Sequence, residues 1–251
     1  MKYLVANWKM NLPQKGVRDY CAALTSTSDP GVRTVLAPPF PFLVETRDES
    51  VRLRLHVDIG AQNCSEHADG AHTGEVSPEM LAGAGCTFVI VGHSERRAHE
   101  GETDPRVNRK AAAAAMRGLI PIICVGEDQS VRESGETRGK IHQQVEAAWS
   151  EALDAAPEVL VAYEPLWAIG TGVHATPDLI AEAGSWISEA IEQSWGGKAS
   201  TKTKIIYGGS VSPENAAELS EVGNVSGFLV GGASLEAEKL LKIHKAMAPR
   251  H

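Results

Sequence analysis

Residues 162–172 decide the fold, and they read AYEPLWAIGTG. An apolar run ends here in a single carboxylate, Glu164. Pro165 restricts the residue before it to extended backbone, so Glu164 is expected to be the last residue of a strand. The glycines at the end of the stretch let the backbone swing and approach a ligand closely. The stretch therefore predicts a fixed carboxylate beside a mobile cover.

Short apolar runs like the one before Glu164 recur along the chain at nearly regular intervals. There are eight, at residues 4–6, 34–37, 57–60, 87–91, 119–125, 159–163, 204–207 and 227–230. Segments with helical spacing lie between them, for example at 108–117, 140–153, 177–193 and 235–246. Strands that alternate with helices predict a parallel α/β sheet. Eight such units in 251 residues predict a closed (β/α)8 barrel that forms one domain over residues 1–251.

The same alternation is compatible with an open, doubly wound α/β sheet, which is the competing interpretation. That fold would need a glycine-rich phosphate-binding fingerprint after the first apolar run, and Asn7-Trp8-Lys9-Met10 stands there instead. Helix starts are marked where a barrel requires them, because Ser77, Thr176 and Ser212 each precede a proline and an acid. We therefore favour the barrel and expect helix N-caps at these three residues.

The composition restricts the classes of function. A formal net charge of -8 argues against a nucleic-acid partner, because no arginine and lysine stripe is available to displace counterions. No apolar run reaches membrane-spanning length and no secretory signal opens the chain, so we expect a cytoplasmic protein without a membrane partner. The four cysteines form no Cys-x-x-Cys pair, and no ligand cluster has metal-binding spacing. Neither a disulfide framework nor a metal is expected.

Polar residues that end the apolar runs are the candidates for chemistry, because reactive groups in such barrels come from the carboxyl ends of the strands. Asn7 and Lys9 follow the first run, His93 the fourth and Glu164 the sixth. A carboxylate base, an imidazole and a cation together suit proton abstraction next to a carbonyl. Taken singly, each has an ordinary interpretation: a surface acid, a hydrogen-bonded core histidine and a solvated lysine.

Glycine pairs follow the seventh and eighth runs at residues 208–209 and 231–232. Such pairs let backbone N–H groups approach an oxyanion, and barrels commonly bind phosphate at this place. One pair is more often a plain turn, but two at matching positions of consecutive units indicate a phosphate site. Its predicted residues are Gly170, Gly209, Ser210, Gly231 and Gly232.

These motifs together resemble one known family. The segments NWK at 7–9, GHSE at 92–95, the stretch at 162–172, YGGS at 207–210 and VGGA at 230–233 fall in the order found in the triosephosphate isomerase family. The resemblance implies a barrel enzyme of glycolysis and gluconeogenesis. It implies interconversion of dihydroxyacetone phosphate and D-glyceraldehyde 3-phosphate through an enediolate, without metal or organic cofactor.

The resemblance assigns roles to five side chains. Glu164 is the general base, His93 is a neutral histidine that shuttles protons between substrate oxygens, and Lys9 stabilises the developing charge. Asn7 orients Lys9, and Glu95 is the carboxylate partner of Lys9. A short helix is expected to begin directly after His93, with its N-terminus facing the ring.

The resemblance also places a lid over the site. Its residues are Pro165, Leu166, Trp167, Ala168, Ile169, Gly170, Thr171, Gly172, Val173, His174 and Ala175. Closure protects an enediolate phosphate from water. Ile169 and Leu229 are the expected apolar walls above Glu164, and Tyr207 is expected to latch the closed lid. The lid ends in Val173-His174-Ala175, where the family commonly has a lysine and then a small apolar residue, and this departure bears on lid timing rather than on chemistry.

The loop that contains Thr73 resembles the dimer loop of the family, together with Gln62 and Asn63. Thr73 is expected to reach the neighbouring subunit near its asparagine and lysine, which predicts a homodimer with an isologous interface. Two positions that are commonly aromatic or apolar in the family are His72 and Glu100 here. The contacts at these two positions are therefore left open.

Two rival functions stay open from the sequence. A relative that acts on a four-carbon ketose phosphate would share the lid and the phosphate loops, so only comparative turnover separates it from a triose phosphate enzyme. A non-catalytic binding protein on the same barrel is the second rival, because a fold does not dictate a function. Its signature would be the loss of Glu164, His93 or Lys9, and all three are present.

Overall fold

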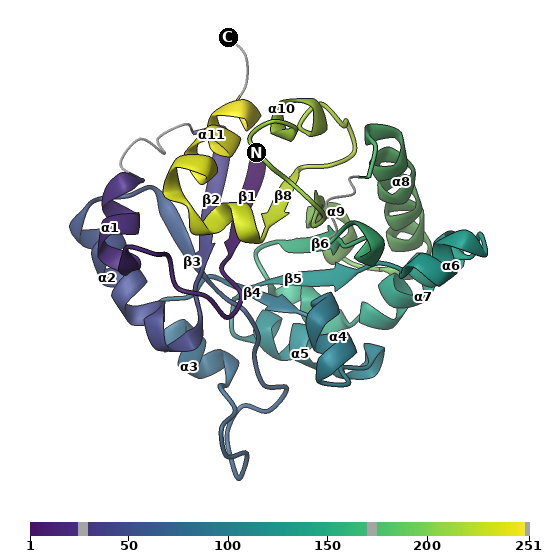
Figure 1. Cartoon of the computed structure of the whole chain (residues 1–251). Helices are drawn as coiled ribbons and strands as arrows, with labels where there is room; N and C mark the ends of the chain where they lie inside the picture. The colour runs from purple at the N-terminus through teal and green to yellow at the C-terminus, as the bar shows by residue number, and fades with distance from the viewer. Residues whose placement is uncertain (25–29, 170–174, 249–251) are drawn as a thin grey trace.

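Eight parallel strands close into a barrel in the computed structural model, which describes residues 1–24, 30–169 and 175–248. The strands are β1 (Lys2–Asn7), β2 (Val32–Ala37), β3 (Val57–Ala61), β4 (Phe88–Val91), β5 (Ile120–Val125), β6 (Val159–Tyr163), β7 (Thr203–Tyr207) and β8 (Gly227–Val230). Neighbours pair in chain order, and β8 pairs with β1 to complete the ring. Figure 1 shows the helices around the outside of this ring. The predicted (β/α)8 barrel is confirmed.

Alternation along each strand produces two hydrophobic cores. In β1, Leu4 and Ala6 belong to the large core in which strands pack against helices, whereas Tyr3 and Val5 belong to a smaller cluster. That smaller cluster consists only of strand residues, so it fills the interior of the barrel. Successive side chains of a strand point to opposite faces, which is why one run of apolar residues supplies both cores.

The helices follow the strands in regular order. Among the described residues they are α1 (Gly16–Ala23), α2 (Leu43–Arg52), α3 (Pro78–Gly83), α4 (Ser94–His99), α5 (Asp104–Met116), α6 (Gln129–Glu133), α7 (Thr137–Ala148), α8 (Pro177–Ser194), α9 (Ala199–Lys202), α10 (Ala216–Leu219) and α11 (Ala237–Met247). Four short 3-10 helices join them: η1 (Phe40–Phe42), η2 (Glu151–Ala155), η3 (Leu166–Ala168) and η4 (Gly232–Leu235). None of the helices in the described part of the chain has the length and apolarity to cross a bilayer.

Two of the three expected N-caps are present. The hydroxyl of Ser77 accepts a hydrogen bond from the backbone N–H of Met80 at 3.3 Å. The hydroxyl of Thr176 accepts one from the N–H of Leu179 at 3.4 Å. Each satisfies a backbone donor in the first turn that has no partner within its helix, so α3 and α8 begin where the sequence indicated.

The expected N-cap at Ser212 is wrong. Its hydroxyl accepts a hydrogen bond from Glu214 N at 3.3 Å, and its own N–H donates to Asn215 Oδ1 at 2.8 Å. These bonds accompany a turn over residues 213–215, and α10 begins only at Ala216. Short polar side chains that bond to nearby backbone compete with helix formation, and here the turn is the result.

The expected helix at residues 140–153 is split in two. The first part, α7, ends at Ala148, and η2 begins at Glu151. Trp149 between them is extended, and its carbonyl accepts a hydrogen bond from Asn108 Nδ2 at 2.5 Å. Its ring stacks on that of Trp195, with centroids 5.9 Å apart. Tertiary contacts therefore end a helix that local periodicity alone would continue.

The loop between β3 and α3 projects from the body of the molecule (Figure 1). It spans residues 62–77, and residues 67–75 are exposed. Because it leaves the carboxyl end of β3, it lies at the same end of the barrel as the polar residues that follow β1, β4 and β6.

Candidate active site

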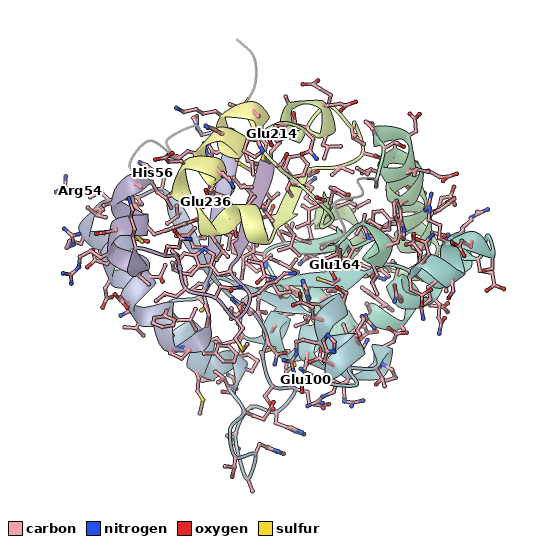
Figure 2. The ribbon with its side chains drawn as sticks, in the orientation of Figure 1. Arg54, His56, Glu100, Glu164, Glu214 and Glu236 are labelled. Atoms are coloured by element: carbon pink, nitrogen blue, oxygen red, sulfur yellow. The ribbon has the colours of Figure 1, made fainter. Side chains whose placement is uncertain are left out.

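A cavity of ≈ 250 Å³ opens at the carboxyl ends of the strands. It is lined by Asn7, Lys9, His93, Glu164, Ile169, Gly208, Gly209, Ser210, Val211, Leu229, Gly231, Gly232 and Ala233. Figure 2 shows Glu164 inside the ring of helices, whereas Arg54 and His56 lie at its periphery. The structure thus gathers the predicted acid, imidazole and ammonium around one space, together with the predicted glycines after β7 and β8.

Glu164 is a buried carboxylate with one oxygen left open. It stands one residue past β6 rather than on its last residue, although its N–H still donates to Val125 O at 2.7 Å and so extends the ladder. Its side chain is only 2 % exposed. Oε2 accepts a hydrogen bond from Ser94 N at 2.8 Å. Oε1 lies 3.0 Å from His93 Nε2 but has no hydrogen-bond partner among the described residues, so it can accept a proton from a ligand.

Two glycines, which the sequence analysis did not assign to Glu164, make room for it. A Cβ added to Gly126 would lie 1.9 Å from the carbonyl oxygen of Glu164, and one added to Gly208 would lie 2.9 Å from its Cγ. Any side chain at either place would displace the carboxylate or its backbone. The run Val125-Gly126 contains no local signal for this role, since the two segments meet only when β5 and β6 pair.

His93 is the N-cap residue of α4, the short helix that was expected to follow it. Its Nδ1 accepts a hydrogen bond from the backbone N–H of Glu95 at 3.2 Å. An acceptor nitrogen carries a lone pair, so in the neutral ring the proton resides on Nε2. His93 therefore presents its N–H donor on the side of the cavity, which the residue lines.

Lys9 is held in a left-handed backbone conformation, with φ 52°. Its N–H donates to Asn7 Oδ1 at 3.0 Å, and Nζ lies 2.6 Å from Glu95 Oε1. The side-chain amide of Gln62 donates to Lys9 O at 2.9 Å and to Ala37 O at 2.8 Å. Non-glycine residues rarely adopt such backbone angles unless their surroundings impose them, and these bonds do so. Gln62 had been assigned only to the dimer loop, so its contact with Lys9 is new.

The ion pair of Lys9 determines the charge of Glu95. Burial alone would raise the pKa of the Glu95 carboxyl, but the hydrogen bond and charge of Lys9 outweigh it, and the pKa lies below its usual value. Glu95 is therefore ionised and keeps a partner for the ammonium when no ligand is bound. The side chain of Lys9 is 28 % exposed, so its ammonium stays accessible from the cavity.

Four of the predicted phosphate residues, Gly209, Ser210, Gly231 and Gly232, line the same cavity. A Cβ at Gly209 would lie 2.1 Å from the hydroxyl of Tyr207, so that ring would have to shift, whereas one at Gly231 would lie 3.2 Å from Lys9 Cε and would press on the Lys9 side chain. Open backbone beside a short helix start is typical of an anion site. Gly170 of the predicted set lies outside the described residues.

The first half of the predicted lid is anchored at its base. Residues 165–169 and Ala175 are described, whereas Gly170, Thr171, Gly172, Val173 and His174 lie outside the described residues. Trp167 Nε1 donates to Glu127 Oε1 at 2.9 Å, Tyr163 donates to the same oxygen at 3.1 Å, and Leu166 N donates to Glu127 O at 2.9 Å. Sequence reasoning missed Glu127, because nothing in the chain near it announces a contact with the lid.

The expected apolar walls of the lid lie at the cavity. Ile169 and Leu229 line it together with Glu164. Burial raises the pKa of Tyr207 to about 12, and backbone groups of Ala175 and Ser210 act in the opposite direction. The buried hydroxyl of Tyr207 has no hydrogen-bond partner among the described residues, so its role as a latch stays a prediction.

Two buried groups near the site take no direct part in it. Burial raises the pKa of the Cys124 thiol well above its usual value, and the charge of Glu164 adds to this, so Cys124 stays a thiol that packs inside the barrel. Lys110 and Glu102 form a fully buried ion pair that also binds Arg96 and Asn63. Asn63 thus bonds inward to Lys110, whereas Thr73 lies exposed in the projecting loop.

Among the described residues there is no group of three or more histidine, cysteine, aspartate or glutamate side chains that could hold a metal ion. The cavity itself presents a carboxylate, an imidazole N–H, an ammonium and open backbone amides. That set can move a proton between adjacent carbons of a small phosphorylated carbonyl compound.

Comparisons with known proteins agree with this chemistry. The family model described as triosephosphate isomerase matches residues 2–247. The chain is 43% identical to the triosephosphate isomerase of Acidiphilium cryptum over 99% of both chains. It is 41% identical to that of Bradyrhizobium diazoefficiens over 96% of both chains. It is 42% identical to that of Thermus thermophilus over 96% of this chain and 97% of the relative.

Proposed function

The chain belongs to the triosephosphate isomerase family, and from that premise we propose how its residues divide the reaction. The protein interconverts dihydroxyacetone phosphate and D-glyceraldehyde 3-phosphate, an aldose–ketose isomerisation of glycolysis and gluconeogenesis. The reaction moves one proton between two neighbouring carbons and one between their oxygens. The proposal concerns which side chain performs each transfer.

Glu164 is the general base in this proposal. Its carboxylate removes the proton from the carbon next to the carbonyl, and the electron pair of that C–H bond becomes the double bond of an enediolate. The same group then returns the proton to the neighbouring carbon. Support comes from the open Oε1 at the wall of the cavity, while Ser94 N holds Oε2. This open oxygen on a buried carboxylate is the observation that carries the proposal.

His93 transfers the second proton. Its Nε2–H donates to the carbonyl oxygen as charge develops there, and the ring then takes the proton of the adjacent hydroxyl. The bond from Glu95 N to Nδ1 supports this, because it occupies one nitrogen and leaves Nε2 as the donor on the cavity side. A neutral imidazole can donate its Nε2 proton and regain one directly, whereas an imidazolium would first have to lose its extra proton.

Lys9 stabilises the negative charge of the enediolate, and Asn7 and Glu95 position it. The bond from Lys9 N to Asn7 Oδ1 fixes the loop, and the ion pair with Glu95 directs the ammonium. A charge that is oriented before the reaction needs no reorganisation in the transition state, which is why such groups lower the barrier.

The phosphate group of the substrate binds to Ser210, Gly231 and Gly232, with Gly170 added by the lid. The first three line the same cavity as His93 and Glu164, and nothing lies within 4 Å of a Cβ added to Gly232. The lid closes with Ile169 over Glu164 and excludes water, which preserves the enediolate phosphate. We extend this assignment to the whole of residues 1–251 as one catalytic domain in the cytoplasm.

A homodimer completes the site in this proposal. Thr73 is exposed in the projecting loop, and Met10, next to Lys9, is 95% exposed despite its apolar side chain. Exposed apolar residues at a functional end of a protein commonly mark a contact surface. We propose that the loop of one copy covers Met10 of the other and brings Thr73 beside Asn7 and Lys9 there.

The substitution Glu164→Asp tests the catalytic assignment. It withdraws the carboxylate from the carbon, so we expect kcat to fall by about 10²–10⁴, while a two-carbon phosphate inhibitor binds nearly as before. The matched control is Glu158→Asp. Glu158 directly precedes Val159, the first residue of β6, whereas Glu164 directly follows the last residue of that strand. Its kcat is expected to stay within about threefold of the wild type. An unchanged kcat for Glu164→Asp would remove Glu164 from the reaction.

A further inference from the structure

A buried serine follows the second glycine pair of the proposed phosphate site. Ser234 lies in η4, and its side chain is fully buried. Gly231 and Gly232, which precede it in the chain, line the cavity. The division of roles proposed above gives Ser234 no part.

Ser234 makes two hydrogen bonds to the carbonyl of Gly231. Its hydroxyl donates to Gly231 O at 2.6 Å, and its own N–H donates to the same oxygen at 2.8 Å. A backbone oxygen has two lone pairs, so it can accept both bonds together. The hydroxyl also lies 3.5 Å from Asn7 O, at the end of β1. The carbonyl of Gly231 is therefore directed toward a buried side chain.

The direction of this carbonyl determines the direction of the next N–H. The peptide bond between Gly231 and Gly232 is trans, and a planar trans peptide places its C=O and its N–H on opposite sides. Because the carbonyl of Gly231 points toward Ser234, the N–H of Gly232 points away from Ser234. Gly232 lines the cavity, and nothing lies within 4 Å of a Cβ added to it, so a ligand can approach its backbone.

Tyr20 of α1 holds Ser234 in place. Its hydroxyl donates to Ser234 O at 2.5 Å. Burial raises the pKa of the Tyr20 phenol well above its usual value, so the hydroxyl keeps its proton and remains a donor. The ring of Tyr20 packs edge-on against Trp8, with centroids 4.9 Å apart. The same tyrosine therefore contacts both η4 and the residue that joins Asn7 to Lys9.

We propose that Ser234 is a positioning residue for the phosphate group of the substrate, because it orients the Gly231–Gly232 peptide with the N–H of Gly232 toward that group. The inference rests on the phosphate site proposed above and adds a residue that does not itself touch the ligand. Without the hydroxyl, one of the two bonds to the Gly231 carbonyl is lost. The carbonyl can then also turn toward the cavity, where its oxygen repels a phosphate anion.

The expected consequence is a loss of affinity for phosphate. When the competent orientation is populated by only a fraction of the molecules, the apparent affinity falls by that fraction. The bond from Ser234 N remains, so the competent orientation becomes less frequent but does not disappear. Phosphate is remote from the reacting carbons and binds alike in the ground state and the transition state, so the effect belongs in KM rather than in kcat.

The variant Ser234→Ala tests the inference, with inorganic phosphate as the probe. Competition with turnover gives the inhibition constant of inorganic phosphate. We expect this constant and the KM for triose phosphate to rise about threefold to tenfold, which is the range of a single net hydrogen bond, while kcat changes by less than about twofold. D-Glyceraldehyde carries no phosphate, so proton exchange on this compound should stay within about twofold of the wild-type rate.

The matched control is Ser50→Ala. Ser50 is also a buried serine whose hydroxyl donates to a backbone carbonyl, Thr46 O at 2.7 Å, but it lies within α2. This variant should keep the wild-type inhibition constant. Tyr20→Phe removes the donor to Ser234 O and is expected to raise the inhibition constant in the same direction as Ser234→Ala. It carries the test by the same criteria if Ser234→Ala does not fold.

Three outcomes would contradict these expectations. An unchanged inhibition constant in Ser234→Ala would overturn the inference and leave the proposed function intact. An equal loss of rate on D-glyceraldehyde and on triose phosphate would also overturn it, because the hydroxyl would then support the site as a whole. A wild-type enzyme that inorganic phosphate does not inhibit would overturn the phosphate site itself and the inference with it.

Discussion

The backbone N–H of Glu95 donates to Nδ1 of His93 over 3.2 Å, and the other nitrogen of that ring lies 3.0 Å from Glu164. One short helix thus decides which nitrogen of the histidine carries the proton. Without that bond both tautomers would be open to the ring, and the donor would face the cavity only part of the time. The positions of the Glu164 carboxylate and the His93 ring therefore depend on backbone N–H groups of α4 as well as on the strands.

The tautomer of His93 can be tested directly. Nitrogen NMR of the ligand-free protein is expected to show Nε2 protonated and Nδ1 unprotonated. The substitution His93→Gln keeps an N–H donor but cannot relay a proton, so we expect kcat to fall by about 10²–10³ with a smaller change in KM. Equal protonation of both nitrogens, or an unchanged kcat, would contradict the assigned role.

Gly126→Ala tests the room made for Glu164. The new Cβ would lie 1.9 Å from the carbonyl oxygen of Glu164, so the backbone of β5 or β6 must shift. A displacement of this size is expected to lower kcat by about 10²-fold. Gly139→Ala in α7 is the matched control, because nothing lies within 4 Å of its added Cβ and activity should be retained. Equal activity of the two variants would show that the geometry at Gly126 is unimportant.

Lys110→Met tests the buried ion pair. It leaves the fully buried carboxylate of Glu102 with Arg96 as its remaining cation, and the free energy of unfolding is expected to fall by about 3–5 kcal/mol. The double variant with Glu102→Gln should recover part of the loss, because no buried charge is then stranded. Urea unfolding at one fixed protein concentration measures both. Lys239→Met breaks an exposed pair with Glu236, and no measurable change is expected there.

The same pair predicts a pH dependence of stability. Burial alone would raise the pKa of Glu102, but Lys110 and Arg96 outweigh burial and hold it below its usual value. Because the pKa of Glu102 is lower in the folded protein than in the unfolded chain, the unfolded chain takes up the proton first as the pH falls. The stabilisation is therefore complete above about pH 4.3 and is lost as the pH falls through the folded value. The stability difference between wild type and Glu102→Gln should shrink only in that acid range, and a difference that shrinks above it would contradict the assignment.

Arg54→Gly is expected to stabilise the protein. Arg54 follows the C-cap of α2 with φ 54°, a left-handed conformation in which a side chain is strained and glycine is not. The expected gain in the free energy of unfolding is about 0.5–1 kcal/mol. Arg54→Ala keeps the strain, so it should bring no gain. Thermal or urea unfolding distinguishes the two, and equal stability would show that the strain is relieved in another way.

The architecture was largely readable from local pattern. Each of the eight apolar runs became a strand with bounds within two residues of those expected, because burial on both faces of a parallel sheet leaves a nearly continuous apolar run in the chain. The helix ends were less readable. Ser212 lies in a turn and Trp149 interrupts a helix because each is held by contacts that the local sequence does not reveal.

The chain by itself determined which chemical groups reach the cavity. Asn7 ends a strand, and Lys9, His93 and Glu164 follow strands. Parallel strands deliver their carboxyl ends to one side of a barrel. The roles of these residues stay predictions until the variants are measured. Tertiary structure alone decided that Gln62 holds Lys9, that Glu127 holds the base of the lid and that Gly126 leaves space for Glu164. The reason is distance along the chain: Ser94 and Glu164 are 70 positions apart, and only closure of the ring brings them to 2.8 Å.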